Sequence, residues 1–258
     1  MNMGVSEAPK LPIDWVDLWW EDIDSQIKRI PEFWDALLED ERKRARRFRF
    51  DRHRERFIVQ RGRLREILSG YWNGVPKAIR FRQGPGGKPA VKPTPPKWLR
   101  RPGGDNPEIR FNLSHSGGHA LYAVTYGREV GVDVEVVRPK PKAAALVERF
   151  FSTNEKAAFQ KLQPHEETAA FFAGWTRKEA YVKAVGKGLR FPLDQFDVSL
   201  KPGDQNALLR VEGAPEETKR WSLRDIDLGP GFRAALAVEM TILSSDKGIS
   251  TRFKHYHQ

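Results

Sequence analysis

The stretch WTRKEAYVKAVGKGL, residues 175–189, has the features of the last turns of a helix. It contains no proline, and Gly186 and Gly188 supply the flexible backbone at which helices commonly end. Glu179 and Lys183 are four residues apart, so a carboxylate and an ammonium stand one turn apart on one side of this helix. Such a pair is either an exposed ion pair worth roughly a few tenths of a kcal/mol or part of a functional site.

An acidic strand pattern occurs in GVDVEVV, residues 131–137. Its strict alternation predicts a strand with the valines on one face and Asp133 and Glu135 on the other. Because residues two apart along a strand are separated by about 6.6 Å, the two carboxylates repel each other unless a cation or protons intervene. The segment is therefore either a strand with a solvated acidic face or, with a third carboxylate from a helix, a Mg²⁺ site.

A cluster of small polar residues ends the apolar alternation of RFNLSHSGGH, residues 110–119. The Gly-Gly turn that follows places Ser114, His115 and Ser116 at the end of a strand. Hydroxyl groups and an imidazole at this place can donate hydrogen bonds to a phosphate. A serine hydrolase is the competing hypothesis, but the segment lacks the Gly-x-Ser-x-Gly turn and no carboxylate is evident to orient His115, so nucleophilic serine catalysis is disfavoured.

Three separate motifs, in this order, resemble those of the 4'-phosphopantetheinyl transferase family. They are FNLSHS at 111–116, GVDVE at 131–135, and WxxKEA at 175–180 with Lys183 and GKGL at 186–189. The resemblance runs from about Glu39 to about Met240 and is closest to the two-lobed, surfactin-synthetase-activating type. It implies that the protein transfers the 4'-phosphopantetheine arm of coenzyme A to a serine hydroxyl of an apo acyl, peptidyl or aryl carrier protein, releasing 3',5'-ADP in a Mg²⁺-dependent reaction.

The same resemblance implies a role for each polar residue of the motifs. Asp133, Glu135 and Glu179 would hold Mg²⁺, with coenzyme A as the co-substrate. Ser114 and His115 would hold phosphate oxygens, and Lys183 would stabilise or protonate the departing phosphate. Either Glu179 or a metal-bound water would accept the proton of the carrier serine.

Cations for the 3'-phosphate of coenzyme A are also implied by the resemblance. In the family they come from the segment that matches Glu41 to Phe57, and by register Arg44 and Arg56 are the matching residues. Glu41 stands where other members can have lysine. Lys88, in a Gly-Lys-Pro sequence, matches a lysine that lies near the nucleotide in the family.

The order of the expected elements indicates two similar halves. A strand, helices and a small sheet are expected over residues 1–127 and again over 128–243, and the polar residues 244–258 are expected to form a flexible tail. The density of glycine and proline predicts a loop without regular structure over 84–107. The family resemblance implies an α+β pseudo-dimer of two lobes, each with helices packed on a small, mainly antiparallel sheet, and an active site in the cleft between the lobes.

Composition restricts the remaining possibilities. The chain has 258 residues and no cysteine, which excludes disulfides and thiolate metal sites. Neither an apolar run of about 18 residues nor an apolar signal region is found, so we expect a cytoplasmic protein with no membrane partner. We expect a monomer as well, because an internal pseudo-dimer already completes the cleft.

A formal net charge of +11 implies an anionic partner, and much of the positive charge lies between residues 42 and 65. A basic RNA-binding protein is therefore one alternative function, and a related fold that binds coenzyme A without catalysis is another. The three motifs favour the transferase. Coenzyme A and an acidic carrier protein would then account for the basic charge, and no nucleic-acid partner is expected.

Overall fold

The computed structural model describes residues 15–72, 74–91, 108–139, 143–188, 191–240 and 250–254. The helices are η1 (Asp24–Arg29), α1 (Ile30–Ala36), α2 (Glu39–Arg46), α3 (Asp51–Trp72), η2 (Pro76–Ala78), η3 (Pro85–Gly87), α4 (Ala143–Phe150), α5 (Thr153–Phe159), α6 (Pro164–Val185), η6 (Leu193–Gln195) and α7 (Glu217–Arg220). The strands are β1 (Trp15–Asp22), β2 (Phe81–Gln83), β3 (Pro89–Val91), β4 (Ile109–Ser116), β5 (His119–Tyr126), β6 (Val130–Val136), β7 (Phe196–Val198), β8 (Leu208–Val211), β9 (Trp221–Ile226), β10 (Phe232–Glu239) and β11 (Ser250–Lys254).

Two sheets form the centre of the molecule, one with the strand order β11-β1-β5-β4 and one with the order β6-β10-β9. The β1-β5-β4 part and the β6-β10-β9 sheet are both antiparallel. In the N-terminal half the first strand, β1, pairs with the last strand, β5, and β5 pairs with β4. In the C-terminal half the first strand, β6, pairs with the last strand, β10, and β10 pairs with β9. The predicted mixture of helices and mainly antiparallel sheets is thus confirmed, and the two halves share one strand order.

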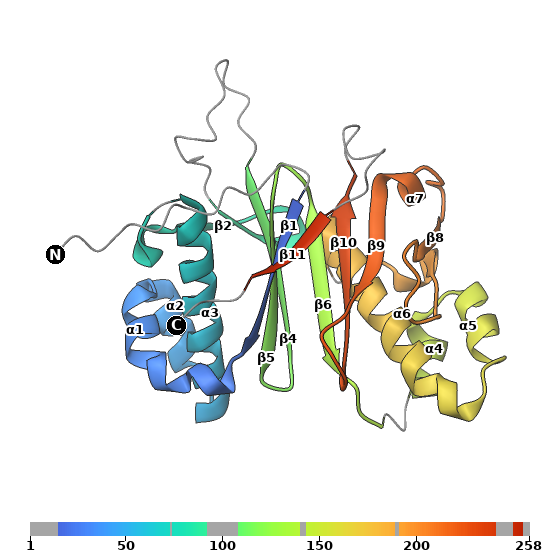
Figure 1. The fold of residues 1–258 in the computed structure, drawn as a ribbon, viewed down its shortest axis with the longest axis horizontal. Helices are drawn as coiled ribbons and strands as arrows, with labels where there is room; N and C mark the ends of the chain where they lie inside the picture. Colours follow the sequence, from blue (N-terminus) through green and yellow to red (C-terminus); the bar gives the residue numbers. More distant parts are fainter. Residues whose placement is uncertain are drawn as a thin grey trace, which may run out of the picture.

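The sheets lie between two groups of helices, with α1, α2 and α3 on one side and α4, α5 and α6 on the other (Figure 1). The alternation of β1 explains this layering, because Trp19 packs into the core below α3 whereas Val16 and Leu18 face the second sheet. That middle core between the sheets also contains Val132 and Leu236. A further core packs α6 against the outer face of the β6-β10-β9 sheet.

The long helix α6 ends at Gly186, which adopts a left-handed conformation with φ of 72°, as the sequence predicted. Its contact with β6 requires a glycine at position 131. A Cβ atom there would lie 2.1 Å from the carbonyl oxygen of Ala180. This close approach brings the end of α6 onto the strand that carries the acidic motif.

Two predictions about irregular segments need correction. The flexible tail proposed for residues 244–258 is wrong for Ser250–Lys254, which forms β11 and pairs in parallel with β1. Arg252 anchors this strand, because its guanidinium bonds the buried carboxylate of Asp17 at 2.5 and 3.0 Å. The proposed loop over 84–107 contains the strand β3, and its remainder from residue 92 lies outside the described residues.

Within the described residues, none of the helices combines the length and the apolar character needed to cross a membrane.

Candidate active site

The edge strands β4 and β6 belong to different sheets and are joined by side chains of β4. The Oδ1 atom of Asn112 accepts a hydrogen bond from the backbone N–H of Val132 at 2.9 Å. The Oγ atom of Ser116 accepts one from the backbone N–H of Val136 at 3.1 Å. The FNLSHS and GVDVE motifs therefore meet along one junction.

Asp133 and Lys183 form the centre of this junction. Lys183 Nζ lies 2.6 Å from Asp133 Oδ1, and the hydroxyl of Ser114 donates to the same oxygen at 2.7 Å. Lys183 Nζ also contacts Ser114 Oγ at 3.0 Å and the carbonyl oxygen of Val132 at 3.3 Å. Asp133 is only 4% exposed. The three motifs found in the sequence thus supply one side chain each to a single buried cluster.

The two glutamates flank this cluster. The hydroxyl of Ser116 donates to Glu135 Oε2 at 2.9 Å. Glu179 is half-buried on α6, and burial raises its pKa, with the negative charges of Asp133 and Glu135 adding to the shift and the charge of Lys183 opposing it. Each of the three predicted carboxylates therefore lies within the electrostatic field of the same site.

The residue types at the site, three carboxylates, are those that a hard divalent cation such as Mg²⁺ prefers. Among the described residues, Asp133 Oδ2 is a buried oxygen with no hydrogen-bond partner, and such an atom gains most from a cation. In the part of the chain that the structure describes, no three His, Asp or Glu side chains converge closely enough to hold a metal ion. The ammonium of Lys183 occupies the side of Asp133 that faces α6. The three carboxylates therefore lie near one another but do not converge on a single point.

A cavity of about 610 Å³ lies on the other face of β4, and Arg44, Arg56 and His115 line it. Side chains alternate between the two faces of β4, so His115 points away from Ser114. This alternation separates the cavity from the cluster around Asp133. Arg56 bonds both oxygens of Asp24, at 2.7 and 2.5 Å, and thereby holds the pKa of that carboxyl below its usual value. Desolvation by surrounding protein, together with the charges of Lys183 and Arg56, lowers the pKa of His115.

Lys88 lies outside this cavity. Its Nζ atom pairs with Glu129 at 2.8 Å and donates to the carbonyl oxygens of Val130 at 2.9 Å and Ala184 at 3.2 Å. Burial lowers its pKa, although Glu129 opposes the shift. Lys88 thus ties the turn before β3 to β6 and α6, and its ammonium does not reach the groups around Arg44 and Arg56.

Comparison with protein families covers both halves of the chain. Residues 129–237 match the 4'-phosphopantetheinyl transferase superfamily, and residues 20–126 match the family described as 4'-phosphopantetheinyl transferase, N-terminal. The chain belongs to the 4'-phosphopantetheinyl transferase superfamily. The resemblance based on the three motifs is confirmed, and with it the class of reaction, which is transfer of the arm of coenzyme A to a carrier protein.

Several transferases from bacteria are similar over most of their length. The 4'-phosphopantetheinyl transferase HetI of Nostoc sp. is 34% identical over 246 residues, which cover 94% of this chain and 93% of that protein. A putative 4'-phosphopantetheinyl transferase of Synechocystis sp. is 32% identical, covering 75% of this chain and 73% of that protein. The 4'-phosphopantetheinyl transferase Sfp of Bacillus subtilis is 28% identical, covering 79% of this chain and 83% of that protein.

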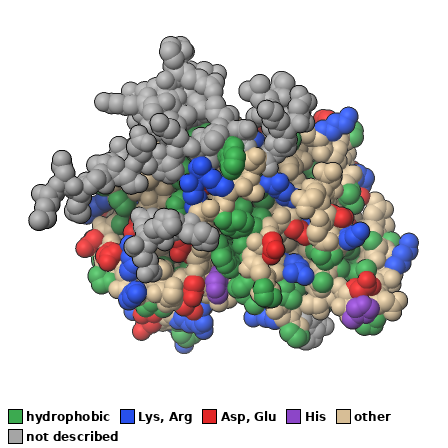
Figure 2. Space-filling view, viewed as in Figure 1, with side chains coloured by type: hydrophobic (Ala, Val, Ile, Leu, Met, Phe, Trp, Pro, Cys, Tyr) green, Lys and Arg blue, Asp and Glu red, His purple; other side chains and the backbone are tan. Residues whose placement is uncertain are grey.

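Part of the arginine-rich segment of the transferase is held by buried or half-buried carboxylates. Glu41, which is 5% exposed, pairs with Arg61 and with Arg65, the latter at 2.6 Å. Arg63 pairs with Glu21 and Glu66. On the face shown in Figure 2, basic side chains are scattered among acidic ones. This pairing gives the segment a structural role, which the RNA-binding alternative did not predict, and it explains the acidic residue at position 41.

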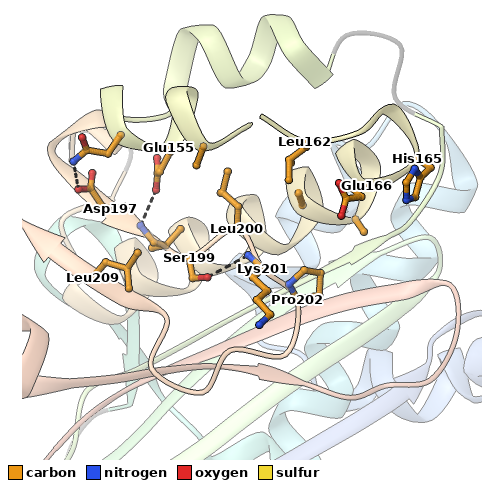
Figure 3. Close-up of a pocket in the computed structure, with 15 residues that line it drawn as sticks. Glu155, Leu162, His165, Glu166, Asp197, Ser199, Leu200, Lys201, Pro202 and Leu209 are labelled. Carbon is orange, nitrogen blue, oxygen red and sulfur yellow. Dashed lines mark hydrogen bonds between the residues drawn. The ribbon is translucent and has the colours of Figure 1, made fainter. Parts of the chain in front are cut away.

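A cavity of about 880 Å³ lies away from the motifs of the transferase, between α5, the start of α6, β7 and β8 (Figure 3). None of the predicted site residues lines it. Polar groups of its lining are bonded to one another: Glu155 Oε1 accepts from the N–H of Val198 at 2.7 Å, and Asn154 donates to Asp197 at 2.7 Å.

The sequence interpretation assigned no role to Asn112 of the transferase, and for Ser116 it offered only a hydrogen bond to a phosphate. A signal for both exists, because Asn112, Ser114 and Ser116 recur with a period of two and therefore share one face of β4. Three polar side chains on one face of a largely buried strand mark that face as a contact surface for other polar groups.

Proposed function

We propose that the junction of β4, β6 and α6 is the catalytic site of this transferase, with Mg²⁺ held by Asp133, Glu135 and Glu179. The buried, unpartnered Oδ2 atom of Asp133, beside Ser114 and Lys183, carries this assignment. When bound, the metal ion would neutralise charge on the pyrophosphate of coenzyme A.

The side chains of the junction suit an in-line transfer. The Oγ atom of the carrier serine forms a bond to the phosphorus next to the pantetheine arm, and the bond from that phosphorus to the oxygen of the leaving phosphate breaks, releasing 3',5'-ADP. Glu179, whose pKa is raised by burial, accepts the serine proton. Lys183 offsets the charge that develops on the departing phosphate, and Ser114 donates a hydrogen bond there.

The 610 Å³ cavity is the proposed position of the nucleotide of coenzyme A. Arg44 and Arg56 line it, and the guanidinium of Arg44 lies 5.2 Å from the ring centre of Phe57. His115 belongs to the same cavity and is next in sequence to Ser114, which faces the junction. One bound coenzyme A would therefore run from the cavity around the end of β4 to the carboxylates.

We also propose that the two halves, 1–127 and 128–243, are the lobes of a pseudo-dimer with the active site at their boundary. The shared strand order of the two sheets supports this division. The cytoplasmic location and the monomeric state remain predictions of the sequence.

Mass spectrometry of apo carrier proteins tests the proposal. One carrier from fatty-acid synthesis and one from a polyketide or peptide synthetase are incubated with the protein, coenzyme A and Mg²⁺. We expect each accepted carrier to gain one phosphopantetheine arm, and we expect chelator or Asp133→Ala to abolish the gain. The matched control is Asp35→Ala, which removes an exposed carboxylate on α1 and should transfer normally. Binding of coenzyme A without any gain would point to the non-catalytic alternative, and binding of polynucleotide alone would point to the RNA-binding alternative.

A further inference from the structure

The junction between the sheets depends on two side chains of β4 that take the place of a backbone ladder. Asn112, 8% exposed, accepts from the N–H of Val132, and Ser116 accepts from the N–H of Val136. The two contacts are four residues apart on β6, or about 13 Å along a strand. They therefore enclose the segment that carries Asp133 and Glu135.

Register along this segment decides which side chains meet. A shift of β6 by one residue would turn Asp133 toward the apolar core that contains Val132 and Val134, because successive side chains alternate between faces. The observed register instead brings Asp133 Oδ1 to within 2.7 Å of Ser114 Oγ. The ladder between β6 and β10 holds β6 within its own sheet, whereas no continuous ladder joins β4 to β6. The two side-chain contacts are therefore the described hydrogen bonds to the backbone that align β6 with β4.

Ser116 acts on a carboxylate as well as on the backbone. Its hydroxyl accepts from the N–H of Val136 at 3.1 Å and donates to Glu135 Oε2 at 2.9 Å. With both functions of the hydroxyl engaged, the Glu135 carboxylate is held relative to the strand. Side chains that hold metal-binding carboxylates in this way commonly change metal affinity by about 10- to 100-fold.

We propose that Asn112 and Ser116 are positioning residues that set the spacing and orientation of Asp133 and Glu135 for a divalent cation. The inference rests on the proposed function and extends it to two residues to which that proposal gives no part in the reaction, although Asn112 also borders the 610 Å³ cavity. Asn112 fixes the register of β6, and Ser116 fixes both the register and the direction of Glu135.

Amide hydrogen exchange followed by NMR tests the backbone contacts directly. In the wild-type protein the N–H groups of Val132 and Val136 should be protected, because each has a hydrogen-bond acceptor. Asn112→Ala should speed exchange at Val132, and Ser116→Ala should speed exchange at Val136. Unchanged protection at these amides would overturn the register role.

Binding of Mn²⁺ in the presence of coenzyme A, measured by electron paramagnetic resonance of the free ion, tests the carboxylate role. We expect Ser116→Ala to raise the Mn²⁺ Kd by about 10-fold or more and to lower kcat, with the KM for coenzyme A within about twofold of wild type. Ser116→Thr retains the hydroxyl and should restore the affinity. Ser222→Ala, a half-buried serine on β9, is the matched control and should change neither value.

The outcomes separate this inference from the function on which it rests. Wild-type protein that binds no Mn²⁺ would overturn both. Wild-type binding that Ser116→Ala leaves unchanged would overturn only the positioning role. A lower melting temperature with an unchanged Mn²⁺ Kd would show that Ser116 is merely structural, which also contradicts the inference.

Discussion

Lys183 Nζ lies 2.6 Å from Asp133 Oδ1, and this contact joins the end of α6 to the middle of β6 across the proposed catalytic junction. The side chain of Lys183 is 28% exposed whereas that of Asp133 is 6% exposed, so the pair forms the boundary between the buried cluster and solvent. A cation at this place compensates the buried charge of Asp133 in the free protein and is available to a phosphate during transfer.

Removing the ammonium should therefore impair transfer more than folding. Lys183→Met keeps the apolar stem, and we expect kcat to fall by about 100-fold or more because a charge that stabilises the departing phosphate is lost. The control is Lys187→Met, just beyond the end of α6, where the ammonium lies 4.9 Å from the ring centre of Phe191. A Lys183→Met enzyme with kcat within about threefold of wild type would contradict the assignment.

Replacing Glu179 by glutamine tests the proposed base. The amide has the same shape but cannot accept the serine proton, so we expect transfer to fall by about 100- to 10,000-fold with an unchanged circular dichroism spectrum. Glu167→Gln changes a carboxylate on an earlier turn of α6 and should leave transfer normal. A folded Glu179→Gln protein with normal turnover would exclude Glu179 as the base.

Lys178, the residue before Glu179, has a structural role. Its ammonium is fully buried, lies 2.8 Å from Glu155 Oε2 and donates to the carbonyl oxygens of Leu193 and Phe196 at 2.6 and 2.8 Å. Burial raises the pKa of Glu155 and lowers that of Lys178, so both shifts favour the neutral forms and the ionised pair is costly to bury. The pair links α6 to α5 and to the start of β7.

Breaking one side of this pair should destabilise the fold strongly. Lys178→Met leaves a buried carboxylate without its cation and should lower the free energy of unfolding by about 3–5 kcal/mol. The double variant Lys178→Met/Glu155→Gln should recover much of that loss, since no charge then remains buried. Urea unfolding of the single and double variants measures both values, and equal stability of the two would refute the explanation.

Asp197 gives the protein a component of stability that depends on pH. Burial opposes its ionisation, but hydrogen bonds from Arg210, Ser152 and Asn154 outweigh it and lower its pKa from 3.8 to about 2. A carboxyl group whose pKa is lower in the folded state stabilises the protein fully at pH values above its pKa in the unfolded chain. This stabilisation is lost as the pH falls toward its pKa in the folded protein.

Asp197→Asn should therefore lower the free energy of unfolding at neutral pH, and the pKa difference accounts for about 2 kcal/mol of that loss. The gap between wild type and variant should narrow by about 1.5 kcal/mol as the pH falls from about 5 to about 2.5. Urea unfolding at intervals over this range measures the gap. A gap that stays constant with pH would show that the carboxylate does not titrate as described.

The last strand should stabilise the N-terminal half. Asp17 is fully buried and bonds Arg252 as well as the hydroxyl of Tyr71 at 2.6 Å. Arg252→Met leaves the carboxylate without a cation, and we expect a loss of about 3 kcal/mol or more in the free energy of unfolding. Phe253→Ser, at an adjacent side chain that is 42% exposed, should cost less than about 1 kcal/mol. Equal effects of the two substitutions would contradict the role of Arg252.

Local sequence patterns predicted the elements that carry the site. The alternation of residues 131–137 and the glycines after Val185 gave the correct strand and helix end, because side-chain periodicity and backbone freedom are properties of the segment itself. The prediction of a flexible tail was wrong because β11 depends on a partner more than 230 residues away in the chain, namely Asp17. No local pattern reports such a contact.

The sequence alone determined the family and the reaction class, because three short motifs resemble those of one family in order, spacing and residue identity. Tertiary structure decided how these residues are used. It paired Lys183 with Asp133, which are fifty residues apart in the chain. It placed His115 in the lining of a cavity that Ser114 does not face, and it paired Lys88 with Glu129. It also paired Arg61 and Arg65 of the arginine-rich segment with the buried carboxylate of Glu41. The reason is physical: the energy of a buried charge depends on which partner the fold brings within hydrogen-bonding distance, and that partner is set by packing between segments that are distant in sequence.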